Sequence, residues 1–127
     1  METRKIRILA VVHNSLLREG ISLSIQLQPD LELVAAVASA EEAVRAFSRH
    51  RPDVTLMDLD LPSAAGIAAI LEILRFDPVT CVLGLCTYDE DALRAQAVRA
   101  GARRCITKDK VNSDLFCLVR DCARHAG

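Results

Sequence analysis

Five side chains that could take part in binding or in a reaction lie near the ends of short segments rich in apolar residues in this 127-residue sequence. They are Asp58, Asp60, Cys86, Thr87 and Lys108. A carboxylate that follows an apolar run, as Asp58 does, is only partly solvated and can accept a cation or a transferred group. A lysine is its natural counter-charge, so these residue types suggest a small charged pocket built on Asp58 and Lys108. An ordinary structural ion pair is the alternative, because such pairs also form without having a function.

Short apolar runs alternate along the chain with segments of helical period, which is the pattern of repeated strand and helix units. We expect five strands, at residues 5–12, 31–37, 53–57, 79–85 and 104–107. The first and the fourth are apolar over most of their length, as strands buried on both faces of a parallel sheet are. Such a chain forms a doubly wound α/β sheet. The order 2-1-3-4-5, which is that of flavodoxin-like folds, gives a (βα)5 three-layer αβα sandwich.

Five helices are expected to connect and follow these strands. The first begins at residue 14 or 15 and ends before Pro29, and the second begins with a capping box formed by Ser39 and Glu42. The third ends at residues 77–78, the fourth runs from residues 89–91 to 101, and the fifth begins at residue 112 or 113. Apolar residues at helical spacing predict the buried faces, which are Leu17, Ile21 and Ile25 in the first helix, Ala43, Val44 and Phe47 in the second, Ile67, Ile70, Leu71 and Leu74 in the third, and Leu115, Leu118, Val119 and Cys122 in the fifth. No linker interrupts this plan, so residues 1–127 are predicted to form one domain.

In a doubly wound sheet, ligands bind beyond the carboxyl ends of the strands, where the strand order reverses. This rule adds the residues after the first strand, Val12, His13 and Asn14, to the pocket. The sequence holds neither GxGxxG nor GxxxxGK[ST], so nucleotide binding is disfavoured. A flavodoxin-like redox protein stays open as an alternative, although residues 13–15 and the single Tyr88 supply little for binding a flavin.

The composition disfavours two broad classes of function. Sixteen Lys and Arg residues against 17 Asp and Glu residues give a formal net charge of −1, so the chain has no overall attraction to nucleic acid or to an anionic membrane. Its longest apolar runs are far shorter than the roughly 20 residues of a membrane span. Residues 1–7 show no charged-then-apolar leader, so we expect a soluble, cytoplasmic protein.

Five cysteines lie in the chain, at positions 81, 86, 105, 117 and 122. Their number is odd, and no CxxC motif or paired histidine suggests a zinc site. We therefore expect free thiols that pack as small hydrophobic side chains, without a disulfide framework.

Four segments of the sequence resemble the receiver domain of bacterial response regulators, specifically the NarL/FixJ-like group. They are residues 6–9 with 16–21, residues 52–62 with Gly66, residues 100–102, and residues 108–109. These segments lie in register at the family's spacing and together span almost the whole chain. The resemblance implies that Asp58 is phosphorylated by a partner histidine kinase and that Lys108 contacts the phosphoryl group. It also implies a role in signalling that is not enzymatic.

Two positions differ from the family's phosphoryl-binding and switch residues. The Thr or Ser that contacts the phosphoryl group falls on Cys86, with Thr87 one residue beyond, and a thiol is a poor hydrogen-bond donor in that role. The aromatic switch residue falls on Cys105. The usual relay therefore lacks both its hydroxyl and its ring, and a redox switch between Cys86 and Cys105 is an alternative use of the two thiols.

The magnesium site of the family is also altered. Typical receivers carry two acidic residues where this chain has Val12 and His13, whereas Mg²⁺ prefers oxygen ligands in an octahedral array. We therefore expect weak Mg²⁺ binding at Asp58 at most, and no other cofactor. Asp60 could compensate in part, although the family uses a backbone carbonyl at its position and a solvated loop acid is the ordinary interpretation. A protonated His13 beside Asp58 could replace the metal cation, or His13 could simply cap the following helix or face water.

The sequence as a whole predicts an atypical receiver domain that acts as a regulatory and protein-interaction module. A conventional receiver, switched by phosphorylation of Asp58, is the competing interpretation. Receivers of this group usually precede a helix-turn-helix domain, so we expect contact with DNA only through such a domain if the parent protein has one. A stand-alone receiver is the alternative. Homodimers through the first and fifth helices, or through the fourth and fifth, fit the family.

Overall fold

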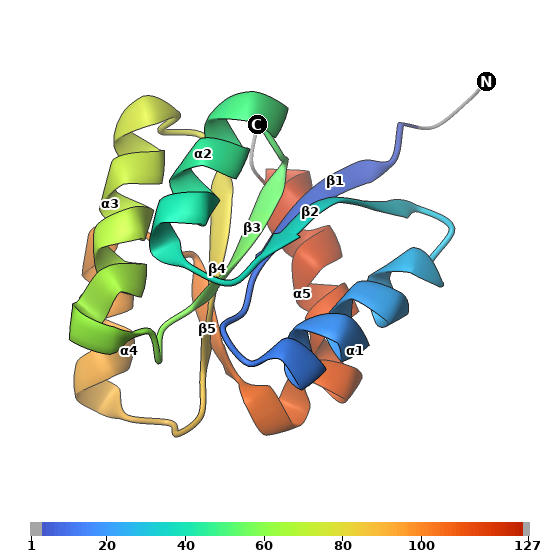
Figure 1. Ribbon diagram of the computed structural model, residues 1–127. Coiled ribbons are helices and arrows are strands. Elements are labelled where there is room, and N and C mark those ends of the chain that lie inside the picture. The colour runs from blue at the N-terminus through green and yellow to red at the C-terminus, as the bar shows by residue number, and fades with distance from the viewer. Residues whose placement is uncertain (1–3, 126–127) are drawn as a thin grey trace.

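Five parallel strands form one sheet in the order β2-β1-β3-β4-β5 in the computed structural model, which describes residues 4–125 (Figure 1). The strands are β1 (Ile6–Val11), β2 (Leu31–Val37), β3 (Val54–Asp58), β4 (Cys81–Cys86) and β5 (Arg104–Thr107). The helices are α1 (Ser15–Gln26), α2 (Ala40–His50), α3 (Ala65–Phe76), α4 (Asp91–Ala100) and α5 (Val111–His125), and the 3₁₀ turns η1 (Pro62–Ala64) and η2 (Lys108–Lys110) precede α3 and α5. The predicted doubly wound α/β fold and its strand order are confirmed.

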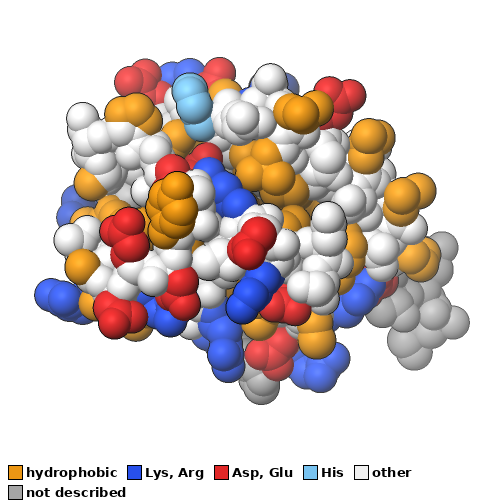
Figure 2. Space-filling view, turned by 90° about the horizontal axis from the view of Figure 1, so that it is seen from below, with side chains coloured by type: hydrophobic (Ala, Val, Ile, Leu, Met, Phe, Trp, Pro, Cys, Tyr) orange, Lys and Arg blue, Asp and Glu red, His pale blue; other side chains and the backbone are white. Residues whose placement is uncertain are grey.

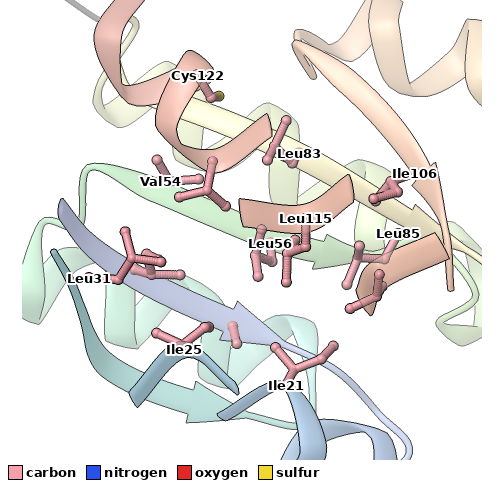
Figure 3. Packing of buried hydrophobic residues seen from close by; sticks show 14 of the residues in the cluster. Ile21, Ile25, Leu31, Val54, Leu56, Leu83, Leu85, Ile106, Leu115 and Cys122 are labelled. Atoms are coloured by element: carbon pink, nitrogen blue, oxygen red, sulfur yellow. The ribbon is translucent and has the colours of Figure 1, made fainter. Parts of the chain in front are cut away.

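Helices cover both faces of the sheet, as Figure 1 shows. On one face, Ile21 and Ile25 of α1 and Leu115 of α5 pack against the strands, and Figure 3 shows these side chains pointing into one cluster. On the other face, α2, α3 and α4 contribute buried residues such as Phe47 and Ile73. Each large apolar side chain buried in this way contributes about 1.5 to 3 kcal/mol. Among residues 4–125, no helix is long and apolar enough to span a bilayer.

Local capping signals place the helix ends where the sequence predicted them. The side chain of Asn14 accepts a hydrogen bond from Leu17 N at 2.9 Å, and that of Ser39 accepts one from Glu42 N at 3.2 Å. Gly101 ends α4 in the left-handed region, with φ at 115°. Because these caps depend on residues within one turn, they could be predicted from the sequence.

Several element boundaries differ from the prediction: β1 and β3 by one residue at each end, and the starts of β4 and α5 as follows. β4 begins at Cys81 rather than at Val79, which is 66% exposed and lies in the turn after α3. α5 begins at Val111, directly after η2, so neither Asn112 nor Ser113 is its cap. The hydroxyl of Ser113 instead donates to the carbonyl oxygen of Lys110 at 3.1 Å.

The buried face of α3 is rotated relative to the prediction. Of the four predicted residues, Ile70 is buried, Ile67 and Leu74 are half-buried against the core, and Leu71 is 48% exposed, whereas Gly66, Ala69 and Ile73 are buried in addition. Gly66 is the physical reason, because a Cβ at this position would collide with the carbonyl oxygen of Asp58. The start of α3 therefore packs directly against the end of β3, and this close approach decides which stripe of the helix faces the sheet.

The expectation that all five cysteines are free thiols is wrong. Cys81, the first residue of β4, forms a disulfide with Cys122 of α5, and their Cα atoms are 6.0 Å apart. The two residues are 41 positions apart in the chain, and only the packing of α5 on the sheet brings them together. The remaining thiols are free, with Cys86 buried, Cys105 half-buried and Cys117 exposed.

Candidate functional site

Asp58 is a buried carboxylate at the carboxyl end of the central strand β3. Its side chain is 1% exposed. Oδ1 accepts hydrogen bonds from Lys108 Nζ and from Asp60 N, each at 2.9 Å, and Oδ2 accepts one from His13 N at 3.0 Å. A charge taken out of water is tolerated only when it is paired and hydrogen-bonded, and these three donors meet that requirement.

Lys108 supplies the positive charge at this end of the sheet. It follows β5, its side chain is 18% exposed, and Nζ lies 2.9 Å from Asp58 Oδ1 and 2.8 Å from Asp60 Oδ2. Burial lowers the pKa of the Lys108 ammonium, but hydrogen bonds to Asp60 and Asp58 outweigh burial and raise the pKa above its ordinary value. The predicted pairing of Lys108 with Asp58 is present, and it extends to a second carboxylate.

Asp60 is more firmly held than a solvated loop acid would be. Its Oδ2 accepts hydrogen bonds from Thr87 N at 2.8 Å and from Thr87 Oγ1 at 2.7 Å, in addition to Lys108. Burial raises the pKa of the Asp60 carboxyl, but the hydrogen bonds from Lys108 and Thr87 outweigh burial and lower it. We call Asp58, Asp60, Thr87 and Lys108 the charged cluster.

The two candidate residues at the end of β4 lie in different surroundings. Thr87 directs its hydroxyl and its N–H to Asp60, so it belongs to the charged cluster. Cys86 is buried in the core, with Sγ 3.8 Å from the carbonyl oxygen of Ile106. Of the two residues that the sequence offered for contact with a phosphoryl group, the structure brings only Thr87 to the cluster.

Neither thiol of the suggested Cys86–Cys105 redox switch is activated by its surroundings. Burial, with the neighbouring Cys105, raises the pKa of the Cys86 thiol, and burial also raises that of Cys105. Since the thiolate is the reactive species in disulfide chemistry, both shifts act against such a switch. The structure shows both cysteines as free.

The residues after β1 offer Asp58 a backbone donor and no carboxylate. Val12 is completely buried in the core cluster under α1 and α5. His13 is exposed, and it contacts Asp58 through its backbone N–H. Asn14, and not His13, caps α1. The cation that the structure places against Asp58 is therefore the Lys108 ammonium rather than an imidazolium of His13.

The donor set does not fit a resident magnesium ion. Among residues 4–125, no group of three or more His, Cys, Asp or Glu side chains is arranged to hold a metal. Val12 offers no ligand atom, and the two nearby carboxylates, Asp58 and Asp60, are both in contact with an ammonium group. Mg²⁺ needs near-octahedral oxygen ligands, which these residues do not supply.

The charged cluster reaches the surface beside α1 and the start of α5. A cavity of about 550 Å³ opens there, and its lining includes Thr87, Lys108, Asn14 and Asn112. Figure 2 views the molecule from this end of the sheet and shows acidic and basic side chains side by side among apolar ones. A partner or a small anion could therefore reach Thr87 and Lys108 from solvent.

The contacts of Asp60 and the role of Arg18 were not predicted from the sequence. Asp60 was named as a site residue, but its side chain was interpreted as a solvated loop acid because its donors follow two other strands. The spacing of two residues signals only the Asx-type turn, in which the Asp58 carboxylate accepts the N–H of Asp60. Arg18 was not considered. Its Nη1 donates to the carbonyl oxygens of Val12 at 2.9 Å and His13 at 3.2 Å, which fixes the backbone that contacts Asp58. No sequence motif predicts this contact of Arg18 with the backbone.

Comparison with known sequences gives a matching family model and several related regulatory proteins. A sequence model described as response regulator receiver domain matches residues 8–120. The oxygen regulatory protein NreC of Staphylococcus haemolyticus (strain JCSC1435) is 33% identical over 108 residues, which is 84% of this chain and 50% of that protein. The uncharacterized transcriptional regulatory protein YxjL of Bacillus subtilis (strain 168) is 30% identical over 124 residues, which is 98% of this chain and 57% of that protein. The chain spans about half the length of the curated relatives it matches.

Solved structures with the same fold cover nearly all of the chain. The response regulator domain of Thermotoga maritima CheB matches with a TM-score of 0.87 and 29% identity, covering 95% of this chain and 98% of that one. The signal receiver domain of the response regulator NarL from Mycobacterium tuberculosis matches with a TM-score of 0.89 and 27% identity, covering 96% and 98%. The arrangement of strands and helices is therefore shared with receiver domains.

Proposed function

The chain belongs to the response regulator receiver domain family, and from this premise we propose that it is an atypical receiver in two-component signal transduction. In this proposal Asp58 keeps the phosphoacceptor position, magnesium-dependent phosphorylation is impaired, and the domain works chiefly as a regulatory and protein-interaction module. It binds no resident cofactor. A histidine kinase or another signalling protein is the partner.

The observation that carries this proposal is the set of groups around Asp58. A receiver that is phosphorylated with the help of Mg²⁺ needs further oxygen ligands beside its phosphoacceptor, because the ion compensates the charge that gathers on the phosphoryl oxygens. Here Val12 is apolar and buried, and His13 reaches Asp58 through its backbone alone. Lys108 is left as the charged partner of Asp58 within the cluster.

Phosphorylation with a small phosphodonor tests the proposal. Purified protein incubated with acetyl phosphate and millimolar Mg²⁺ should show little phosphorylation of Asp58 by intact-protein mass spectrometry. The Val12→Asp, His13→Asp double variant should gain both Mg²⁺ affinity and labelling, and an Asp58→Asn version of it should lose the labelling. Rapid, stoichiometric labelling of the unaltered protein would refute the proposal.

A conventional phosphorylation switch is the second candidate, and one observation favours it. Thr87 Oγ1 and Lys108 Nζ meet beside Asp58, where a hydroxyl and an ammonium could contact a phosphoryl group. A kinase that holds its phosphohistidine in line with Asp58 could then supply part of the geometry that the metal site lacks. Labelling by a kinase, with none by acetyl phosphate, would favour this candidate.

The relatives suggest a wider context for the domain. Several are named transcriptional regulatory proteins and are about twice as long as this chain. We propose that residues 1–127 form the receiver domain of a cytoplasmic transcriptional regulator, with DNA contact confined to a separate helix-turn-helix domain. A homodimer through α1 and α5, or through α4 and α5, is part of this proposal, and light scattering of the purified protein tests it.

A further inference from the structure

One oxygen atom in the charged cluster accepts three hydrogen bonds. Oδ2 of Asp60 lies 2.8 Å from Thr87 N, 2.7 Å from Thr87 Oγ1 and 2.8 Å from Lys108 Nζ. A backbone N–H, a hydroxyl and an ammonium that converge on one point are the donors that bind an oxygen of phosphate or sulfate. In this protein a carboxylate of the chain itself fills that position.

The position of Asp60 is also fixed from its other side. Its N–H donates to Oδ1 of Asp58 at 2.9 Å, and Asp58 is anchored in turn by His13 N at 3.0 Å. The three donors to Asp60 come from residues that follow β4 and β5, whereas Asp60 itself follows β3. The contact therefore ties the ends of three neighbouring strands together, although the Asp60 side chain remains 33% exposed.

We propose that Asp60 is an internal anionic ligand that occupies the oxyanion subsite formed by Thr87 and Lys108. The inference rests on the proposed function, an atypical receiver, in that it takes Thr87 and Lys108 as the donors that a phosphoryl group on Asp58 would meet. The Asp60 carboxylate holds the segment that begins at Thr87 in the position that an oxyanion would otherwise impose. It also competes with any external phosphate or sulfate for the same donors. Asp60 is thus a positioning residue, and it makes the arrangement of this edge independent of phosphorylation.

The charges of the cluster, like the occupied donors, oppose the binding of an external anion. Asp58 and Asp60 bring two carboxylates against the one ammonium of Lys108. A phosphate that entered the subsite would add negative charge beside Asp60, and the described residues hold no set of metal ligands to compensate it. Removal of the Asp60 carboxylate therefore frees the donors and weakens the repulsion at once.

Anion titration tests the occupancy of the subsite. Inorganic phosphate and sodium sulfate are added separately at constant ionic strength, while the amide signal of Thr87 is followed by ¹H–¹⁵N NMR. The unaltered protein should bind each anion only weakly, and Asp60→Ala should bind at least about tenfold more tightly, since a hydrogen bond to a charged group contributes that much or more. Asp109→Ala is the matched control. It removes an exposed carboxylate next to Lys108 in the sequence, and it should leave anion binding as in the unaltered protein.

A second measurement tests the positioning role without any added anion. Tyr88 is the only tyrosine, the chain has no tryptophan, and the Tyr88 side chain is 71% exposed directly after Thr87. Asp60→Asn should speed amide hydrogen exchange at Thr87 by about tenfold and lower the fluorescence anisotropy of Tyr88. Thr87→Val, which removes the hydroxyl from the other side of the same contact, should shift the Tyr88 anisotropy in the same direction. Unchanged amide exchange within β1 shows that each variant is folded.

Two results would overturn the inference. One is phosphate binding of equal strength in the unaltered protein and in Asp60→Ala. The other is exchange at Thr87 that does not change in Asp60→Asn. Both readouts are independent of the phosphodonor experiment, because neither uses Mg²⁺ or labelling of Asp58. Rapid labelling of the unaltered protein, together with faster Thr87 exchange in Asp60→Asn, would therefore contradict the proposed function and support the role of Asp60. Little labelling, together with unchanged Thr87 exchange in Asp60→Asn, would support the proposed function and contradict the role of Asp60.

Discussion

The amino and carboxyl ends of the sheet are held by different kinds of interaction. At the amino end, a disulfide joins Cys81 of β4 to Cys122 of α5, and Asp53 accepts hydrogen bonds from Arg7 N and Arg4 Nη2, each at 2.9 Å. At the carboxyl end, the charged cluster is held by ion pairs and hydrogen bonds. A covalent bond does not depend on pH or salt, whereas contacts between charged groups do. The amino end therefore has one connection that pH and salt do not affect, whereas the connections within the charged cluster all involve a charged group.

The largest expected effect is at the amino end. Reduction of the Cys81–Cys122 disulfide should lower the free energy of unfolding by about 4 kcal/mol, because the bond restricts the unfolded chain across a separation of 41 residues. Urea unfolding with and without a reductant measures the difference, and Cys117→Ser, which changes an exposed free thiol, is the control. Alkylation of the denatured, unreduced protein should label the three thiols of Cys86, Cys105 and Cys117. Labelling of all five cysteines would contradict the comparison between the two ends.

The next effect is at the carboxyl end. Lys108→Met should lower the free energy of unfolding by about 3 kcal/mol, because it leaves the buried carboxylate of Asp58 without its ammonium. Adding Asp58→Asn to this variant should restore much of the loss, since the uncompensated charge is then gone. Arg4→Ala is the matched comparison at the amino end, where the ion pair with Asp53 is largely exposed and contributes below about 1 kcal/mol. Equal losses for Lys108→Met and Arg4→Ala would argue against a special role for burial.

A smaller change in the free energy of unfolding is expected from a residue inside the sheet, between its amino and carboxyl ends. Thr55, the second residue of β3, is completely buried, and its hydroxyl has no hydrogen-bond partner in the part of the chain that the structure describes. Thr55→Val should raise the free energy of unfolding by about 1 kcal/mol, because an unsatisfied buried hydroxyl is replaced by a methyl group of similar size. Thr87→Val, whose hydroxyl is bonded to Asp60, should not stabilise the protein. Thermal unfolding of both variants checks the contrast.

The smallest effect is a dependence on acid pH at the amino end. The pKa of the Asp30 carboxyl lies below its ordinary value because Arg120 donates two hydrogen bonds to it, at 2.8 and 3.0 Å. A lowered pKa in the folded state means that the contribution is complete above the unfolded value of about 3.9 and is lost as the pH falls through the folded value. The pair is solvent-exposed, so the loss should stay below about 1 kcal/mol. The stability difference between unaltered protein and Asp30→Asn, followed by urea unfolding against pH, should shrink in this range; a constant difference would contradict the assignment.

The main residues of the candidate site and the pairing of Lys108 with Asp58 could be predicted, but the contacts of Asp60 and Thr87 could not. Asp58 follows an apolar run and Lys108 follows the last predicted strand, and the rule for doubly wound sheets brings such positions to one edge. The choice between Cys86 and Thr87 stayed open, because Cys86 ends β4 and Thr87 follows it, and only the packed structure decides which of the two side chains meets the cluster. Asp60 was misinterpreted for a related reason. Its donors lie after two other strands.

Local signals in the sequence determined where most elements begin and end. The alternation of apolar runs and helical periods predicts the strand and helix units, and the caps at Asn14 and Ser39 depend on hydrogen bonds within a single turn. The tertiary structure alone decided the disulfide between Cys81 and Cys122, the rotation of α3 set by Gly66, and the three donors on Asp60. The physical reason is that periodicity and capping report interactions between neighbours in the chain. Contacts between distant segments depend on packing distances and directions that arise only when the layers come together.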